Sequence, residues 1–145
     1  MEDRIQDIRE TFRIKTFDSE EHLYFLKEDL QPMQTIMNCM TFKSEDTQEV
    51  LRLDYIRRDT MITVMEYSKQ YQRMVKAGEK DQEISRWSLD FLRNIENEKL
   101  YDILNCSNFL DFSYLFESCL TTCARLLDES NDSPDVDKMK KLLGI

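Results

Sequence analysis

The sequence predicts an α+β fold with a small sheet, in which most of the helices follow the strands along the chain. Two observations support this class: three short strand-like runs lie within the first 53 residues, and apolar residues recur at helical spacing from residue 60 onward. Helices grouped against a small sheet are typical of α+β proteins. The length of 145 residues allows one domain with its own core, or a small domain with an appendage.

The first two strands follow a charged N-terminal extension. Residues 1–11 hold two isoleucines among charges and are expected to form a short helix or a frayed arm. Apolar and polar side chains alternate over residues 12–17, which is a strand pattern. Residues 18–20 (Asp-Ser-Glu) supply turn chemistry, and the run Leu-Tyr-Phe-Leu at 23–26 predicts a returning strand.

A helix and a third strand are expected next. The helix should cover residues 31–40, with Pro32 in its first turn, where a missing N–H costs least. Its apolar side consists of Met33, Ile36, Met37 and Met40. Residues 41–49 read as a polar loop, and residues 50–53 as the third strand.

The longest predicted helix covers residues 60–76, with Asp59 as its N-cap. Its expected inward line consists of Met61, Val64, Met65, Ser68, Tyr71 and Val75. A short linker over residues 76–83 follows.

The densest apolar stretch, residues 87–127, reads as two helices joined by an Asn-Phe-Leu-Asp corner at residues 108–111. The first helix places Leu100, Ile103 and Leu104 inward at a period of 3.6 residues. In the second, which Asp111 or Ser113 could cap, two adjacent apolar lines make a wide face: Leu115, Cys119, Cys123 and Leu127, with Phe116, Leu120 and Ala124.

The composition of the sequence changes from apolar to hydrophilic after residue 127. Residues 128–132 form a hydrophilic hinge, and Ser-Pro-Asp at 133–135 is a helix-start pattern. The helix expected there has one apolar stripe, made of Val136, Met139, Leu142 and Leu143.

Composition excludes several classes of partner. The formal net charge of −9 disfavours binding to nucleic acid or to anionic membranes, which need a basic footprint. No apolar run approaches the roughly 20 residues of a membrane span, and the start MEDRIQDIRE is too charged for a secretory signal. A cytoplasmic and nuclear location is therefore expected. The four cysteines lie on predicted helices, where core packing explains them better than a metal pair.

Signals for catalysis are weak. Two glycines leave no phosphate-binding loop, and the one histidine, His22, falls in or beside the predicted hairpin. The 29 acidic residues are spread evenly, as on the surface of an ordinary acidic protein. The sequence therefore predicts a protein that is not an enzyme and that has no metal or other cofactor.

The stretch at residues 87–127 resembles the S-phase-kinase-associated adaptor family, whose members join an F-box protein to a cullin in SCF-type ubiquitin ligases. The resemblance rests on three motifs in order: W-x-x-[DE]-F-L, L-[YF]-[DE], and N-[FY]-L-D followed by an aliphatic helix. The matching residues are Trp87, Asp90, Phe91, Leu92, Leu100, Tyr101, Asp102, Asn108, Phe109, Leu110, Asp111, Leu115, Thr122 and Ala124.

This resemblance implies a BTB/POZ-like domain over residues 12–110, and C-terminal helices for F-box binding over residues 111–145. It places the cullin contact at the corner and on the earlier helix, that is, at Asn108, Phe109, Met37 and Met40. The F-box contact falls on the last helix and the tail, at Leu115, Phe116, Cys119, Leu120, Cys123, Val136, Met139, Leu142 and Leu143.

Two other functions stay open at this point. The chain could be a BTB protein that self-associates through exposed apolar helices. It could also be an adaptor like elongin C, although that protein ends near the helix at 115–127, so residues 128–145 count against it. For the adaptor, we expect the tail from residue 133 to be loosely ordered alone and to fold onto an F-box partner.

Overall fold

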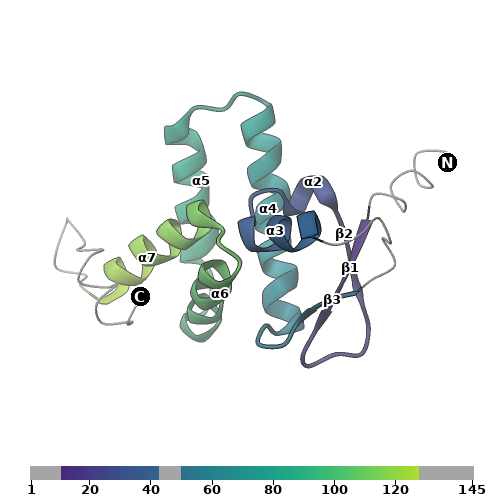
Figure 1. Ribbon diagram of the computed structural model, residues 1–145. Coiled ribbons are helices and arrows are strands. Elements are labelled where there is room, and N and C mark those ends of the chain that lie inside the picture. The colour runs from purple at the N-terminus through teal and green to yellow at the C-terminus, as the bar shows by residue number, and fades with distance from the viewer. Residues whose placement is uncertain (1–10, 43–49, 128–145) are drawn as a thin grey trace.

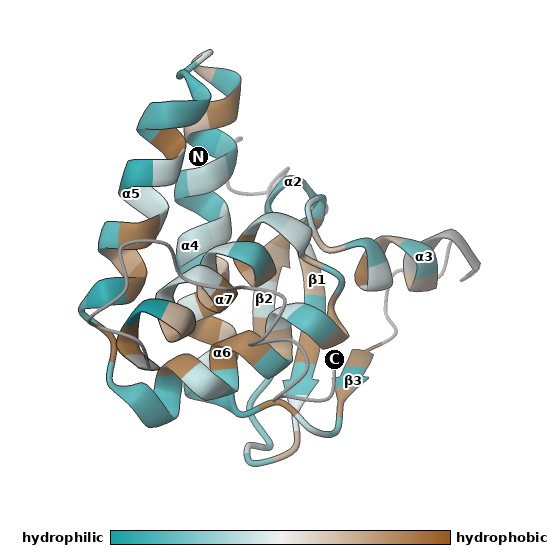
Figure 2. Cartoon of the chain, turned by 90° about the vertical axis from the view of Figure 1, so that its left-hand side faces the viewer, coloured by the Kyte–Doolittle hydropathy of each residue, from teal (hydrophilic) through white to brown (hydrophobic). Residues whose placement is uncertain are grey.

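A computed structural model describes residues 11–42 and 50–127 of the chain (Figure 1). Its elements, in order, are β1 (Thr11–Thr16), β2 (Leu23–Leu26), α2 (Lys27–Leu30), α3 (Gln34–Phe42), β3 (Val50–Leu53), α4 (Arg58–Lys76), α5 (Asp81–Arg93), α6 (Asn97–Phe109) and α7 (Ser113–Leu127). The expected α+β class is confirmed. None of the helices in the described ranges is long and apolar enough to cross a membrane. The hydropathy colouring shows hydrophilic and hydrophobic residues interspersed along α5 (Figure 2).

The sheet is mixed and has the strand order β2-β1-β3. β1 pairs antiparallel with β2 and parallel with β3, with Thr16 opposite Leu53 at the end of the parallel pair. The three predicted strands are therefore present, although β1 begins at Thr11, one residue inside the predicted extension. Because β1 and β3 run parallel, their carboxyl ends lie at the same edge of the sheet.

The region between β2 and β3 differs from the prediction in two ways. A short helix, α2, follows β2 directly and had no counterpart in the predicted elements. The helix expected from residue 31 begins instead at Gln34, and Pro32 lies in the turn before it. In that turn, the N–H of Met33 donates to the carbonyl of Leu30 at 2.9 Å.

α4 lies between the sheet and the group of α5, α6 and α7 (Figure 1). Its predicted cap was wrong: the N-cap position is Arg57, and Asp59 lies in the first turn. The first N–H is instead satisfied by a distant side chain, because the backbone N–H of Arg58 donates to Oδ1 of Asp18 at 2.9 Å. The predicted inward line also ends early, since Val75 is 46% exposed.

The stretch from residue 87 to residue 127 contains parts of three helices rather than two. α5 already begins at Asp81, so the predicted linker shrinks to residues 77–80. In this linker Gly78 adopts a positive φ of 74°, a conformation that glycine reaches without a steric penalty. α5 ends at Arg93 and α6 begins at Asn97.

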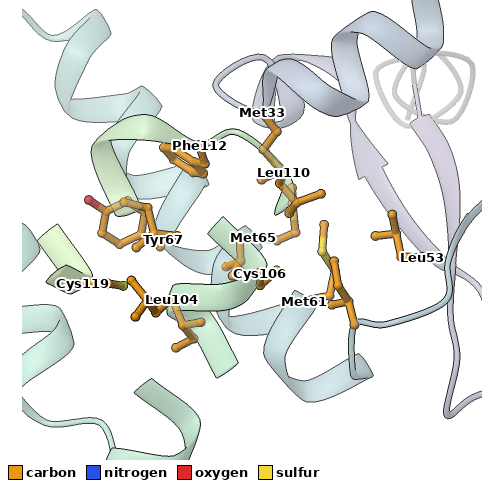
Figure 3. Close-up of a cluster of buried hydrophobic side chains, with 14 of the residues drawn as sticks. Met33, Leu53, Met61, Met65, Tyr67, Leu104, Cys106, Leu110, Phe112 and Cys119 are labelled. Carbon is orange, nitrogen blue, oxygen red and sulfur yellow. The ribbon is translucent and has the colours of Figure 1, made fainter. Parts of the chain in front are cut away.

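One buried cluster joins the sheet to all the long helices. Met61 and Met65 of α4 lie between Leu53 of β3 and the residues Leu104 and Leu110 (Figure 3). Tyr67, which the predicted inward line omitted, is 1% exposed. Its hydroxyl lies 2.6 Å from that of Ser88 on α5, and its ring contacts Trp87, Phe91, Phe112 and Tyr71.

Candidate protein-interaction surface

The corner between α6 and α7 is a tight reversal with a defined inside and outside. Asp111 has a φ of 54°, the left-handed conformation that aspartate tolerates better than most residues. The N–H of Phe112 donates to the carbonyl of Ser107 at 2.9 Å, which closes the end of α6. Leu110 and Phe112 are buried, whereas Asn108 and Phe109 are exposed. The reversal therefore presents the two predicted cullin residues outward.

Carbonyl groups of this corner cap the start of α3. The backbone N–H of Thr35 donates to the carbonyl of Leu110 at 3.1 Å, and its hydroxyl donates to that of Phe109 at 2.8 Å. The N–H of Gln34 donates to the carbonyl of Asp111 at 3.4 Å. First-turn N–H groups of a helix have no partner within the helix, so these bonds determine where α3 begins.

This capping places α3, which carries the other two predicted cullin residues, directly beside the corner. Met37 is partly buried against the core. Met40 belongs to α3, but its side chain lies outside the described part of the structure. The structure thus brings Met37, Asn108 and Phe109 onto two adjoining elements, although α3 and the corner are more than 60 residues apart in the chain.

A hollow of about 330 Å³ opens beside Phe109, and we call it the aromatic hollow. Two further aromatic residues line it: Phe17, which directly follows β1 in the chain, and Tyr55, the second residue after β3. Because those strands run parallel, both aromatic side chains leave the sheet at one edge. Phe17 is 51% exposed, Tyr55 88% and Phe109 49%. Large exposed apolar side chains gathered at one place indicate a protein-binding surface.

Neither Phe17 nor Tyr55 was among the predicted site residues. A signal was present in the sequence: both stand in turns that follow strands, where small and polar residues are the usual choice. An aromatic side chain in such a turn has no core to enter, so its presence there points to a contact. Their convergence with Phe109 could not be read from spacing, since the three residues come from three separate parts of the chain.

Polar groups complete the aromatic hollow. Arg57 lies at one side, while Asp102 and Asn105 of α6 lie at another. Thr60 also lines the hollow; it is 2% exposed, and its hydroxyl has no hydrogen-bond partner within the described residues. An unsatisfied buried hydroxyl costs about 1–3 kcal/mol, so a bound group that reached it would recover part of that cost.

The predicted F-box residues on α7 divide into two groups. The role of Leu115, Cys119 and Leu120 as F-box contacts stays a prediction, but in this structure all three are core residues with no exposed surface. The physical reason is that α7 packs on both α5 and α6, which cover its apolar lines. Phe116 and Cys123 are only partly buried, and they lie two helical turns apart on one side of α7. Leu126, 46% exposed, was not predicted.

The remaining predicted F-box residues, Val136, Met139, Leu142 and Leu143, lie outside the described residues, as do the proposed hinge and most of the N-terminal extension. Their role therefore stays a prediction.

The described cysteines are free thiols, and two of them, Cys106 and Cys119, are buried. Burial, with a smaller contribution from Asp102, raises the pKa of Cys106 to about 12. Burial also raises the pKa of Cys119 well above its ordinary value. Thiols with such pKa values stay protonated at neutral pH and are poor nucleophiles. Within the described ranges, no three His, Cys, Asp or Glu side chains form a group that could hold a metal ion.

Comparison of the chain with protein-family models and with curated proteins finds no match.

Proposed function

We propose that this chain is a non-enzymatic adaptor of the BTB/POZ type, which joins F-box substrate receptors to a cullin in an SCF-type ubiquitin ligase. The proposal rests on the resemblance of residues 87–127 to the S-phase-kinase-associated adaptors. The observation that carries it is the exposure of Phe109, which lines the aromatic hollow, because the resemblance implies a cullin contact at this corner.

On the cullin side, the proposed contact consists of Asn108, Phe109 and Met37, enlarged by Phe17 and Tyr55. Aromatic side chains that remain half exposed in the free chain can bury further area against a partner without rearranging the core. Such anchors commonly carry most of the binding energy of an interface. The backbone carbonyl of Phe109 itself accepts the hydrogen bond from the Thr35 hydroxyl, so the position of Phe109 is fixed by a contact with α3 as well as by α6.

On the F-box side, the burial of Leu115, Cys119 and Leu120 changes the proposed contact. We assign this contact to Phe116 and Cys123, extended by Leu126 and by the apolar stripe of the tail. The three buried residues support α7 from inside. The cullin and F-box contacts would then use different surfaces of the molecule, as an adaptor requires.

The test uses Phe109→Lys in the full chain, with calorimetry against a cullin N-terminal fragment and, separately, against an F-box domain. Charging an anchor at an interface centre is expected to cost about 2 kcal/mol or more in cullin binding and to leave F-box binding nearly unchanged. Tyr24→Lys is the matched control, since Tyr24 is 61% exposed on β2 and does not line the aromatic hollow.

Two results would contradict the proposal. Equal losses from Phe109→Lys and Tyr24→Lys would show that the corner has no special role in cullin binding. Absence of binding by the unmodified chain to either partner would remove the adaptor function altogether. In that event, sedimentation equilibrium would test the second candidate, self-association, which the three exposed aromatic side chains of the hollow also favour. Phe109→Lys should then shift the chain from dimer to monomer.

A further inference from the structure

A second surface lies between α5 and α7, and it is lined mainly by charged and polar residues rather than by aromatic ones. It is an open groove of about 720 Å³, which we call the arginine groove. Arg86, Leu89 and Arg93 stand at spacings i, i+3 and i+7, so they share one face of α5. Arg125 of α7 lines the opposite side.

The charge of this groove is opposite to that of the chain. Three arginines line it against two aspartates, Asp81 and Asp90, whereas the whole chain has a formal net charge of −9. Arg93 forms an ion pair with Asp90 at 3.8 Å, but both side chains are more than half exposed, so the pair is weak. Arg86 and Arg125 form no ion pair within the described residues.

The chain itself contains a segment of matching chemistry, which directly follows α7 in the sequence. Residues 128–137, Asp-Glu-Ser-Asn-Asp-Ser-Pro-Asp-Val-Asp, hold five acidic side chains and no basic one. The segment begins three residues after Arg125, which is exposed near the end of α7. Ten residues span up to roughly 33 Å when extended. The thirteen residues of α5 measure about 20 Å along the helix axis, so the segment can reach every arginine of the groove.

We infer that residues 128–137 bind in the arginine groove of their own chain, with acidic side chains placed against Arg86, Arg93 and Arg125. Direct attachment gives the segment a high effective concentration at the groove, which an acidic segment of another protein lacks. The inference concerns the charged first half of the tail, and it does not depend on the proposed adaptor function. It leaves the apolar residues beyond that segment, Met139, Leu142 and Leu143, available to a partner.

The experiment compares the full chain with the double variant Arg86→Glu and Arg125→Glu by hydrogen exchange of the peptides that cover residues 128–137. In the unmodified chain at low salt we expect exchange to be slower than in the variant by about threefold or more, a modest factor because exposed ion pairs are individually weak. Raising the salt to about 1 M, where the Debye length is about 3 Å, should remove the difference.

The matched control is Lys27→Glu with Arg52→Glu, which makes the same change in net charge at two exposed positions that do not line the groove. Its exchange rates in residues 128–137 should equal those of the unmodified chain. A charge swap adds a second criterion: Asp132→Arg and Asp135→Arg in the arginine-reversed variant should restore slow exchange.

Three outcomes would overturn the inference. The first is equal exchange in the unmodified chain and the arginine-reversed variant at low salt. The second is an equal loss of protection in the control variant, which would reflect net charge alone. The third is protection that disappears on roughly tenfold dilution, which would mean that the groove holds the tail of a second copy.

Discussion

The aromatic hollow and the α7 helix are both rich in apolar side chains, but the fold uses them in opposite ways. Phe109 and Phe112 make the contrast plain, since they are the same residue type three positions apart. Phe109 is 49% exposed at the rim of the hollow, whereas Phe112 is 1% exposed and contacts the rings of Tyr67 and Tyr71. Apolar character alone therefore does not distinguish an exposed residue from a core residue.

The same lesson applies to the predicted F-box residues. The resemblance assigned Leu115, Cys119 and Leu120 to a partner, but in this structure α5 and α6 cover the apolar lines to which they belong. Two residues of the hollow show the opposite case. Phe17 and Tyr55 belong to no apolar line, and both are exposed. Within the described residues, most apolar side chains at helical spacing are buried, whereas Phe17 and Tyr55, in the turns after β1 and β3, are exposed.

The largest expected effect separates the two phenylalanines. Phe112→Ala should lower the free energy of unfolding by about 3–5 kcal/mol, because it leaves a cavity beneath Tyr67 and Tyr71. Phe109→Ala should lower it by about 1 kcal/mol or less, since the ring is half exposed. Urea denaturation of both variants measures the difference. Similar losses would mean that the corner does not separate core from surface.

A smaller effect concerns the hydrogen bond between the hydroxyls of Tyr67 on α4 and Ser88 on α5. Tyr67→Phe removes the partner of the Ser88 hydroxyl, which is fully buried. The expected loss is about 1–2 kcal/mol in the free energy of unfolding, mainly the cost of leaving that hydroxyl unsatisfied. Adding Ser88→Ala should recover part of the loss, as measured by a double-mutant cycle. Strictly additive losses would show that the two hydroxyls are not coupled.

The bond between α3 and the corner tests whether the predicted cullin surface is one unit. Thr35→Val keeps the shape of the side chain but removes the hydroxyl that donates to the carbonyl of Phe109. We expect a loss of about 0.5–1.5 kcal/mol in stability, together with weaker binding of the cullin fragment. Thr121→Val is the control, because its hydroxyl bonds only to the carbonyl of Glu117 within α7. If both variants bind the fragment alike, the position of α3 does not matter for that contact.

The smallest expected effect is a pH dependence at the edge of the aromatic hollow. The backbone N–H of Arg58 donates to the Asp18 carboxylate and lowers the pKa of that carboxyl. A lowered folded-state pKa means that the stabilisation is complete above the ordinary aspartate value of about 3.9, and is lost as the pH falls through the folded-state pKa. The difference in melting temperature between the unmodified chain and Asp18→Ala should therefore be larger at neutral pH than in acid. A difference that does not change with pH would exclude the ionised carboxylate as the cap of α4.

Much of the fold followed from local patterns. The strands at β2 and β3 have the predicted bounds, and α4 ends at Lys76 as predicted. Two errors share one cause, which is contact across long sequence distances. α3 begins where the carbonyls of the α6–α7 corner cap it, and α4 begins one residue after Arg57, where Asp18 accepts the N–H of Arg58 while Asp59 accepts only that of Thr60. Neither of these long-range contacts has a signal within a short window of sequence.

The sequence by itself determined the α+β class, the inward faces of most helices and the place of the α6–α7 corner, because each of these follows from the spacing of apolar residues and from turn chemistry nearby. Only the tertiary structure decided which apolar residues stay exposed. Phe17, Tyr55 and Phe109 meet because β1 and β3 run parallel and end at one edge, beside the end of α6. Arg86 and Arg125 face one groove because α5 packs on α7. Exposure depends on what the rest of the chain covers, and that is a property of the whole fold.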